Sequence, residues 1–151
     1  MKYSEIKQVK AFCEDLFSQP DWREVIENIE SGEADFEVDG VRFISDEGID
    51  EIMQDELSSD ESILGCFNSR FISIILGVRE SVIKDIQEAE AFEAIGRWII
   101  DSNKLEKLQQ KYVEADGYGH HFNYYDGNEE ELTIGKYDET GYLFYHVFDN
   151  R

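Results

Sequence analysis

The sequence predicts a single α+β domain in which five or six helices pack on a C-terminal antiparallel sheet. Up to Gly117, apolar residues keep helical spacing, and beyond it the chain becomes rich in aromatic and β-prone residues. No repeat or low-complexity linker separates these parts. With 151 residues, of which 41% are hydrophobic, the chain can bury a substantial core. We therefore expect residues 1–151 to form one domain.

Capping and breaking residues set the limits of the predicted helices. Pro20 should end the first helix, and Gly32 and Gly77 are placed to end two later ones. Asp21 stands three residues before Glu24, which is the spacing of a capping box. The predicted helices cover about 4–18, 21–31, 46–57, 59–76, 79–101 and 103–114.

The two longest predicted helices, 59–76 and 79–101, carry the widest apolar faces. Ser58 and Glu61 have the spacing of a capping box for the first of them, and Gly96 in the second should allow close helix packing. The residues that we expect to be largely buried are Phe67, Phe71, Ile75, Ile86, Phe92, Ile95 and Ile99. Their exposure in one patch would instead indicate an interface between copies, so a homodimer stays open.

A β-hairpin is predicted over residues 34–44. Phe36 and Val38 alternate with acidic residues, and Asp39-Gly40 is typical of a type I′ turn. An isolated hairpin is marginal in water, so this one should either join another sheet or lie on helices.

The C-terminal segment predicts a three-stranded meander within about 118–148. Its strands should cover roughly 119–125, 130–135 and 142–148, with turns at Asp126-Gly127 and at 138–141. Many aromatic residues in this segment argue against a disordered tail.

The cysteines and the hydropathy indicate a cytoplasmic protein. Cys13 and Cys66 lie in apolar helical patterns without a CxxC motif, which predicts two reduced, buried thiols. No run of about 18 apolar residues is present to span a bilayer, and the first residues have no signal-peptide pattern.

The charge is large and unevenly distributed. The formal net charge is −21, and residues 21–62 carry 16 acids against 2 bases. Such a charge repels nucleic acid and anionic membranes and attracts basic surfaces. We therefore expect no direct binding of nucleic acid or membrane, and a basic protein as partner.

Acidic residues recur in pairs along the helix predicted at 46–57 and just beyond it. Ile49, Ile52, Met53 and Leu57 fall on one face, which leaves the carboxylates on the other. Successive pairs start four or five residues apart, about 6–7.5 Å along a helix, near the spacing of phosphates along a nucleic-acid strand. The predicted partner-binding residues are Asp46, Glu47, Asp50, Glu51, Asp55, Glu56, Asp60 and Glu61, with the run Glu129, Glu130 and Glu131. The alternative is that these acids only solvate a helix face.

No motif of a known catalytic, phosphate-binding or metal site is present. In size and charge, the chain resembles the nucleic-acid-mimic proteins that phages and mobile elements use against restriction or CRISPR systems. That resemblance implies a non-catalytic inhibitor or modulator that occupies the basic groove of a nucleic-acid-binding protein, without a cofactor or metal.

Two alternatives come from the C-terminal segment. An interaction module could use its aromatic residues Tyr124, Tyr125, Tyr142 and Tyr145. A small enzyme or metal site could form around His120, His121 and His146 if these histidines meet across strands. Salt dependence of binding separates the first alternative from mimicry, and metal content tests the second.

Overall fold

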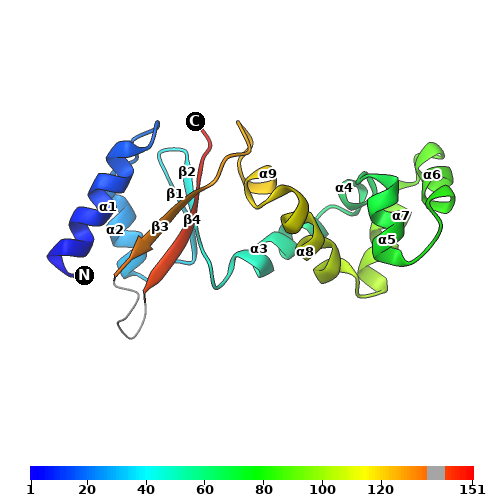
Figure 1. The fold of residues 1–151 in the computed structure, drawn as a ribbon, viewed down its shortest axis with the longest axis horizontal. Helices are drawn as coiled ribbons and strands as arrows, with labels where there is room; N and C mark the ends of the chain where they lie inside the picture. The colour runs from blue at the N-terminus through cyan, green and yellow to red at the C-terminus, as the bar shows by residue number, and fades with distance from the viewer. Residues whose placement is uncertain (136–141) are drawn as a thin grey trace. The chain divides into compact units, whose positions relative to one another are not determined.

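The computed structural model describes residues 1–135 and 142–151. Within them the chain forms nine helices and one four-stranded antiparallel sheet (Figure 1), which confirms the α+β class. It divides into two compact units, one of Met1–Ile49 with Asp116–Arg151 and the other of Asp50–Ala115. That the two units form a single domain stays a prediction.

The elements follow one another in a simple order. The helices of the described residues are α1 (Tyr3–Asp15), α2 (Trp22–Glu30), α3 (Ile49–Ser58), α4 (Glu61–Gly65), α5 (Ser69–Leu76), α6 (Glu80–Glu88), α7 (Phe92–Asp101), α8 (Leu105–Asp116) and α9 (Gly119–Phe122). The strands are β1 (Asp35–Val38), β2 (Val41–Ser45), β3 (Glu130–Ile134) and β4 (Leu143–Asp149).

The first unit is built on a sheet with the strand order β1-β2-β4-β3. The helices α1 and α2 cover one face of this sheet (Figure 1), and the side chains between them form the core. Because side chains alternate along a strand, Tyr145 and Val147 of β4 face these helices, whereas His146 and Phe148 face the opposite side, where Phe148 meets Phe122 of α9.

The predicted hairpin is confirmed, and it joins the sheet. Asp39 and Gly40 both have positive φ, at 50° and 82°, as a type I′ turn requires. The second hairpin strand, β2, pairs with β4 in an antiparallel register that places Phe43 opposite Val147. The marginal stability of a lone hairpin is thus overcome by addition of a third strand.

The predicted first strand of the meander, 119–125, is wrong. Residues 119–122 form the helical turn α9, and the Asn123 side chain accepts hydrogen bonds from the backbone N–H groups of Tyr125 and Asp126. This side-chain turn offers the backbone an alternative to a strand. The other two strands exist as β3 and β4, and the turn predicted at 138–141 lies outside the described residues.

Each of the two long predicted helices is divided in two, so the predicted count of five or six helices is wrong. The first, 59–76, breaks at Asn68, whose side chain caps α5 by accepting from the N–H groups of Arg70 and Phe71. Its expected cap, Ser58, is replaced by Asp60, which accepts from Ser62 and Ile63. The second, 79–101, breaks at Glu90, whose φ is 60°.

The helices α4 and α7 pack closely against each other. A Cβ atom on Gly96 would lie 2.0 Å from the carbonyl oxygen of Glu61, and one on Gly65 would lie 2.0 Å from that of Phe92. The two helices therefore touch backbone to backbone, as predicted for Gly96. The break between α6 and α7 is a helix end at Glu90, where the backbone N–H of Glu90 donates to the carbonyl of Gln87 and that of Ala91 donates to the carbonyl of Ile86.

The expected core is confirmed in part. Ile75, Ile95 and Ile99 are buried. The other four, Phe67, Phe71, Ile86 and Phe92, are half-buried. Both cysteines are free thiols, but only Cys13 is buried, so the prediction that Cys66 is a core thiol is wrong. In the described part of the chain, none of the helices has the length and apolar character needed to cross a bilayer.

Candidate partner-binding surfaces

The acidic helix has the amphipathic form that the sequence predicts. Met53 and Leu57 of α3 are buried, while Glu51 and Asp55 are exposed. Among the described residues, neither of these two carboxylates has a hydrogen-bond or ion-pair partner. They stand four positions apart on a helix, which places them about 6 Å apart along its axis. They are therefore available to a binding partner.

Asp50, on the same helix, binds a buried side chain of the second unit. Its carboxylate accepts a hydrogen bond of 2.8 Å from Nε2 of Gln109, a fully buried residue of α8. The Gln109 carbonyl in turn accepts from Nε2 of Gln54 at 3.0 Å. Because a buried amide that loses its partner is costly, Asp50 has a structural role.

The last predicted pair is also engaged within the second unit. Asp60 is the N-cap of α4, and the carboxylate of Glu61 forms an ion pair of 3.2 Å with Arg97. Glu56, which precedes them, is half-buried. The acids from Asp50 to Glu61 therefore do not form a uniform row of available carboxylates.

Asp46 and Glu47 belong to the first unit, and only Asp46 is engaged there. Its Oδ1 lies 2.8 Å from Nε2 of His146, while Glu129 binds Nδ1 of the same ring. The imidazole thus joins two carboxylates that enter from different loops. Glu47 is exposed and has no partner among the described residues.

The electrostatics of His146 follow from this position. Burial disfavours the charged ring, but the hydrogen bonds and negative charges of Glu129 and Asp46 outweigh burial and raise the pKa of His146 above 6.5. The rings of Tyr118 and Phe144 pack against it at centroid distances of 4.9 Å. Sequence reasoning missed this cluster, because Asp46 is a hundred positions from the histidine.

Glu129, Glu130 and Glu131 have different roles. Glu129 is half-buried against His146, and Glu130 and Glu131 are exposed on β3. Only the last two can face a partner freely. The predicted acidic run is therefore partly structural.

The structure gives the histidine alternative no geometric support. His120 and His121 lie on α9 and His146 on β4. Within the residues that the structure describes, no group of three or more histidines, cysteines and acids could hold a metal ion. Both nitrogens of His146 lie against carboxylates, Nδ1 against Glu129 and Nε2 against Asp46.

The tyrosines do not form one aromatic surface. Tyr145 is buried and donates a hydrogen bond to the carbonyl oxygen of Glu33 at 3.2 Å. Tyr142, directly before β4, is 41% exposed. Tyr124 and Tyr125 lie in the loop after α9 and are highly exposed. The aromatic residues open to a partner thus belong mainly to this loop.

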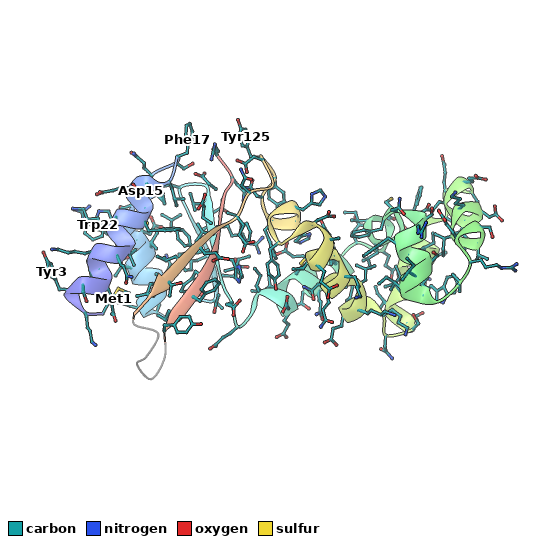
Figure 2. The ribbon with its side chains drawn as sticks, viewed as in Figure 1. Met1, Tyr3, Asp15, Phe17, Trp22 and Tyr125 are labelled. Atoms are coloured by element: carbon teal, nitrogen blue, oxygen red, sulfur yellow. The ribbon has the colours of Figure 1, made fainter. Side chains whose placement is uncertain are left out.

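A cavity of about 340 Å³ opens in the first unit between the end of α1 and the C-terminal segment. Its lining includes Phe17 and four carboxylates, those of Asp15, Asp126, Glu130 and Asp149. Figure 2 shows Phe17 and Tyr125 pointing outward, and the guanidinium of Arg151 lies over both rings, 4.5 and 5.3 Å from their centroids. Sequence reasoning did not identify this cavity.

The first unit is also the more acidic of the two. Counted from the sequence, it carries 21 acids and 7 bases, against 14 and 7 in the second unit. Two thirds of the net charge of −21 therefore belong to the unit that holds the cavity.

Comparison of the chain with protein-family models, with curated proteins and with solved structures found no match.

Proposed function

We propose that this protein is a non-catalytic acidic modulator that acts in the cytoplasm and occupies the basic surface of a nucleic-acid-binding protein. The observation that carries the proposal is the pair Glu51 and Asp55, whose exposed carboxylates have no partner among the described residues. They are held on a helix whose opposite face is buried through Met53 and Leu57. A rigid display of negative charge complements a positive groove and speeds association.

The overall charge supports the same proposal. Both units are acidic, with net charges of −14 and −7. Glu47, Glu130 and Glu131 add exposed carboxylates to the first unit. A partner with a basic groove for nucleic acid would be attracted to either unit, whereas nucleic acid itself would be repelled.

The test uses the full chain as bait on a column, with a cell extract passed over it. Retained basic proteins should be eluted by short duplex DNA and by added salt, because DNA would compete for the same groove and salt screens surface charges. The variant Glu51→Gln with Asp55→Asn should retain severalfold less. The matched variant Asp85→Asn with Glu88→Gln, which neutralises one Asp and one Glu exposed on α6, should retain as much as the wild type.

Retention that is insensitive to DNA and salt would contradict the proposal. So would an equal loss in the two charge-matched variants, because the α3 carboxylates would then be no more than a solvated face. In that case the exposed aromatic residues of the first unit, Phe17, Tyr124 and Tyr125, become the better candidates for an interaction module.

A further inference from the structure

The cavity beside Phe17 contains two carboxylates that are available to bind a cation. Asp15 of α1 and Glu130 of β3 both line it, and neither carboxylate has a hydrogen-bond or ion-pair partner among the described residues. The other two carboxylates are engaged. Asp149 accepts from the N–H and the hydroxyl of Ser18, and Asp126 accepts from the Asn123 amide.

Arg151 offsets only part of this negative charge. Its guanidinium lies 3.8 Å from Asp126 and 3.9 Å from Asp149, at the outer limit of an ion pair. Four carboxylates and one guanidinium thus line the cavity, which leaves a formal excess of three negative charges. A second cation would be attracted to the two free carboxylates.

The apolar wall of the cavity favours a cation with a flat, weakly hydrated head. Phe17 is 75% exposed, so one face of its ring is available to a ligand. Arg151 already demonstrates the geometry, because its guanidinium stacks on Phe17 at 4.5 Å and approaches Tyr125 at 5.3 Å. Guanidinium groups stack on aromatic rings and pair with carboxylates better than ammonium groups do.

The size of the cavity limits the ligand. Its volume of about 340 Å³ lies at the lower end of the range of roughly 300–1,000 Å³ that is typical of small-ligand pockets. One side chain fits such a space, whereas a folded segment does not.

We propose that this cavity binds an arginine side chain of a basic partner protein, with Asp15 and Glu130 as counter-ions and the Phe17 ring as stacking face. The inference rests on the proposed function for the origin of the arginine, but the site is defined by the first unit alone. It adds a specific contact for arginine to an otherwise long-range attraction between charges.

The first test is a titration of the ¹⁵N-labelled full chain with acetyl-arginine amide, followed by NMR. The neutral acetyl-citrulline amide, which has nearly the same shape, is the ligand control. Arginine should cause saturable shifts of the amide signals of Phe17 and Asn128, both in the cavity lining, and citrulline should not. Equal binding of the two compounds would overturn the proposal.

Variants then assign the binding to the cavity. Asp15→Asn with Glu130→Gln should weaken binding of acetyl-arginine amide at least fivefold, and Phe17→Ala severalfold. Glu24→Gln with Glu27→Gln removes the same charge from exposed positions of α2 that do not line the cavity, and should change binding less than twofold. Wild-type affinity in the cavity variants would overturn the assignment.

The last test concerns the origin of the arginine. An arginine-rich peptide of twelve residues should bind at least threefold more tightly than a lysine-rich peptide of the same length, and Phe17→Ala should abolish this difference. Equal affinity of the two peptides would mean that the cavity does not distinguish arginine from lysine in a polypeptide. Because Glu51→Gln with Asp55→Asn should leave binding of acetyl-arginine amide unchanged, failure of the α3 surface and failure of the cavity are separate results.

Discussion

Gly96 of α7 lies against Glu61 of α4 so closely that a Cβ atom would stand 2.0 Å from the Glu61 carbonyl oxygen. Gly65 of α4 has the same relation to Phe92 of α7. Each helix thus places a glycine against the backbone of the other helix. The residue contacted, Glu61 or Phe92, stands four positions before the glycine of its own helix. The contact is reciprocal, and a side chain at either glycine must separate the helices.

We expect Gly96→Ala to lower the free energy of unfolding by about 2–4 kcal/mol, since the obstructing atoms belong to the backbone and cannot rotate away. Gly65→Ala should have a similar effect. Urea unfolding measures both. Ala94→Gly, at an exposed position of the same helix, should cost no more than about 1 kcal/mol. A Gly96→Ala variant as stable as Ala94→Gly would disprove the close contact.

Neighbouring acids of α3 should differ in their effect on stability. Asp50→Ala removes the carboxylate acceptor of the buried Gln109 amide and should cost about 1–3 kcal/mol. Glu51→Ala removes an exposed carboxylate from a crowded negative surface and should leave stability unchanged or slightly higher. Thermal unfolding of the two variants provides the comparison. Equal destabilisation would show that Asp50 does not support Gln109.

The histidine cluster predicts a pH dependence with a defined sign. The pKa of His146 is raised, so its contribution to stability is complete below pH 6.5 and is lost as the pH rises through the raised pKa. His146→Gln lacks that charge. The difference in unfolding free energy between the wild type and His146→Gln should therefore shrink as the pH rises from 6.5 through the raised pKa.

Urea unfolding at several pH values measures this difference, and an NMR titration of the His146 ring gives its pKa directly. Asp46→Asn should move that pKa down, because one hydrogen-bonded negative charge is lost. A difference that is constant with pH would show that folding does not shift the pKa of this ring.

The two thiols should differ sharply in reactivity. Burial, together with the negative charges of Asp21 and Glu14, raises the pKa of Cys13 to about 12. Since the thiolate is the reactive form, Cys13 should resist a thiol reagent until the protein unfolds, while the exposed Cys66 reacts in the native state. Titration with a chromogenic disulfide should give one fast thiol, and Cys66→Ser should remove it. Two fast thiols would contradict the burial of Cys13.

Arg151 should compete with an added arginine for the Phe17 ring. Arg151→Ala exposes the ring faces that its guanidinium covers and removes a positive charge from the cavity. Acetyl-arginine amide should then bind about two- to fivefold more tightly. Lys7→Ala, which removes a charge that lies over Tyr3, controls for net charge. Weaker binding after Arg151→Ala would mean that this residue builds the cavity instead of competing for it.

Local sequence signals predicted the hairpin and the amphipathic α3 because each depends on residues a few positions apart. Asp39-Gly40 defines its own turn, and the spacing of Met53 and Leu57 defines a helix face. The break at Glu90 was not predictable in this way, since helix-forming alanines flank it and the left-handed conformation that ends α6 is usually adopted by glycine or asparagine.

The candidate sites also divide into features set by residues close in sequence and features set by residues far apart in sequence. The exposed Glu51 and Asp55 were predictable from periodicity. The commitment of Asp50 to Gln109 and of Asp46 to His146 was not, because those partners are 59 and 100 positions away. The cavity beside Phe17 joins the end of the first helix to the last residues of the chain, and no pattern in either segment indicates the other.

The pairing of β2 with β4 has a consequence for synthesis on the ribosome. Asp46 emerges a hundred residues before His146, which is a delay of roughly 5–20 s at typical elongation rates of about 5–20 residues per second. Throughout that interval, in which Asp50–Ala115 is synthesised, β2 presents an unpaired edge. The nascent hairpin is therefore open to mispairing through this edge until β4 has been made.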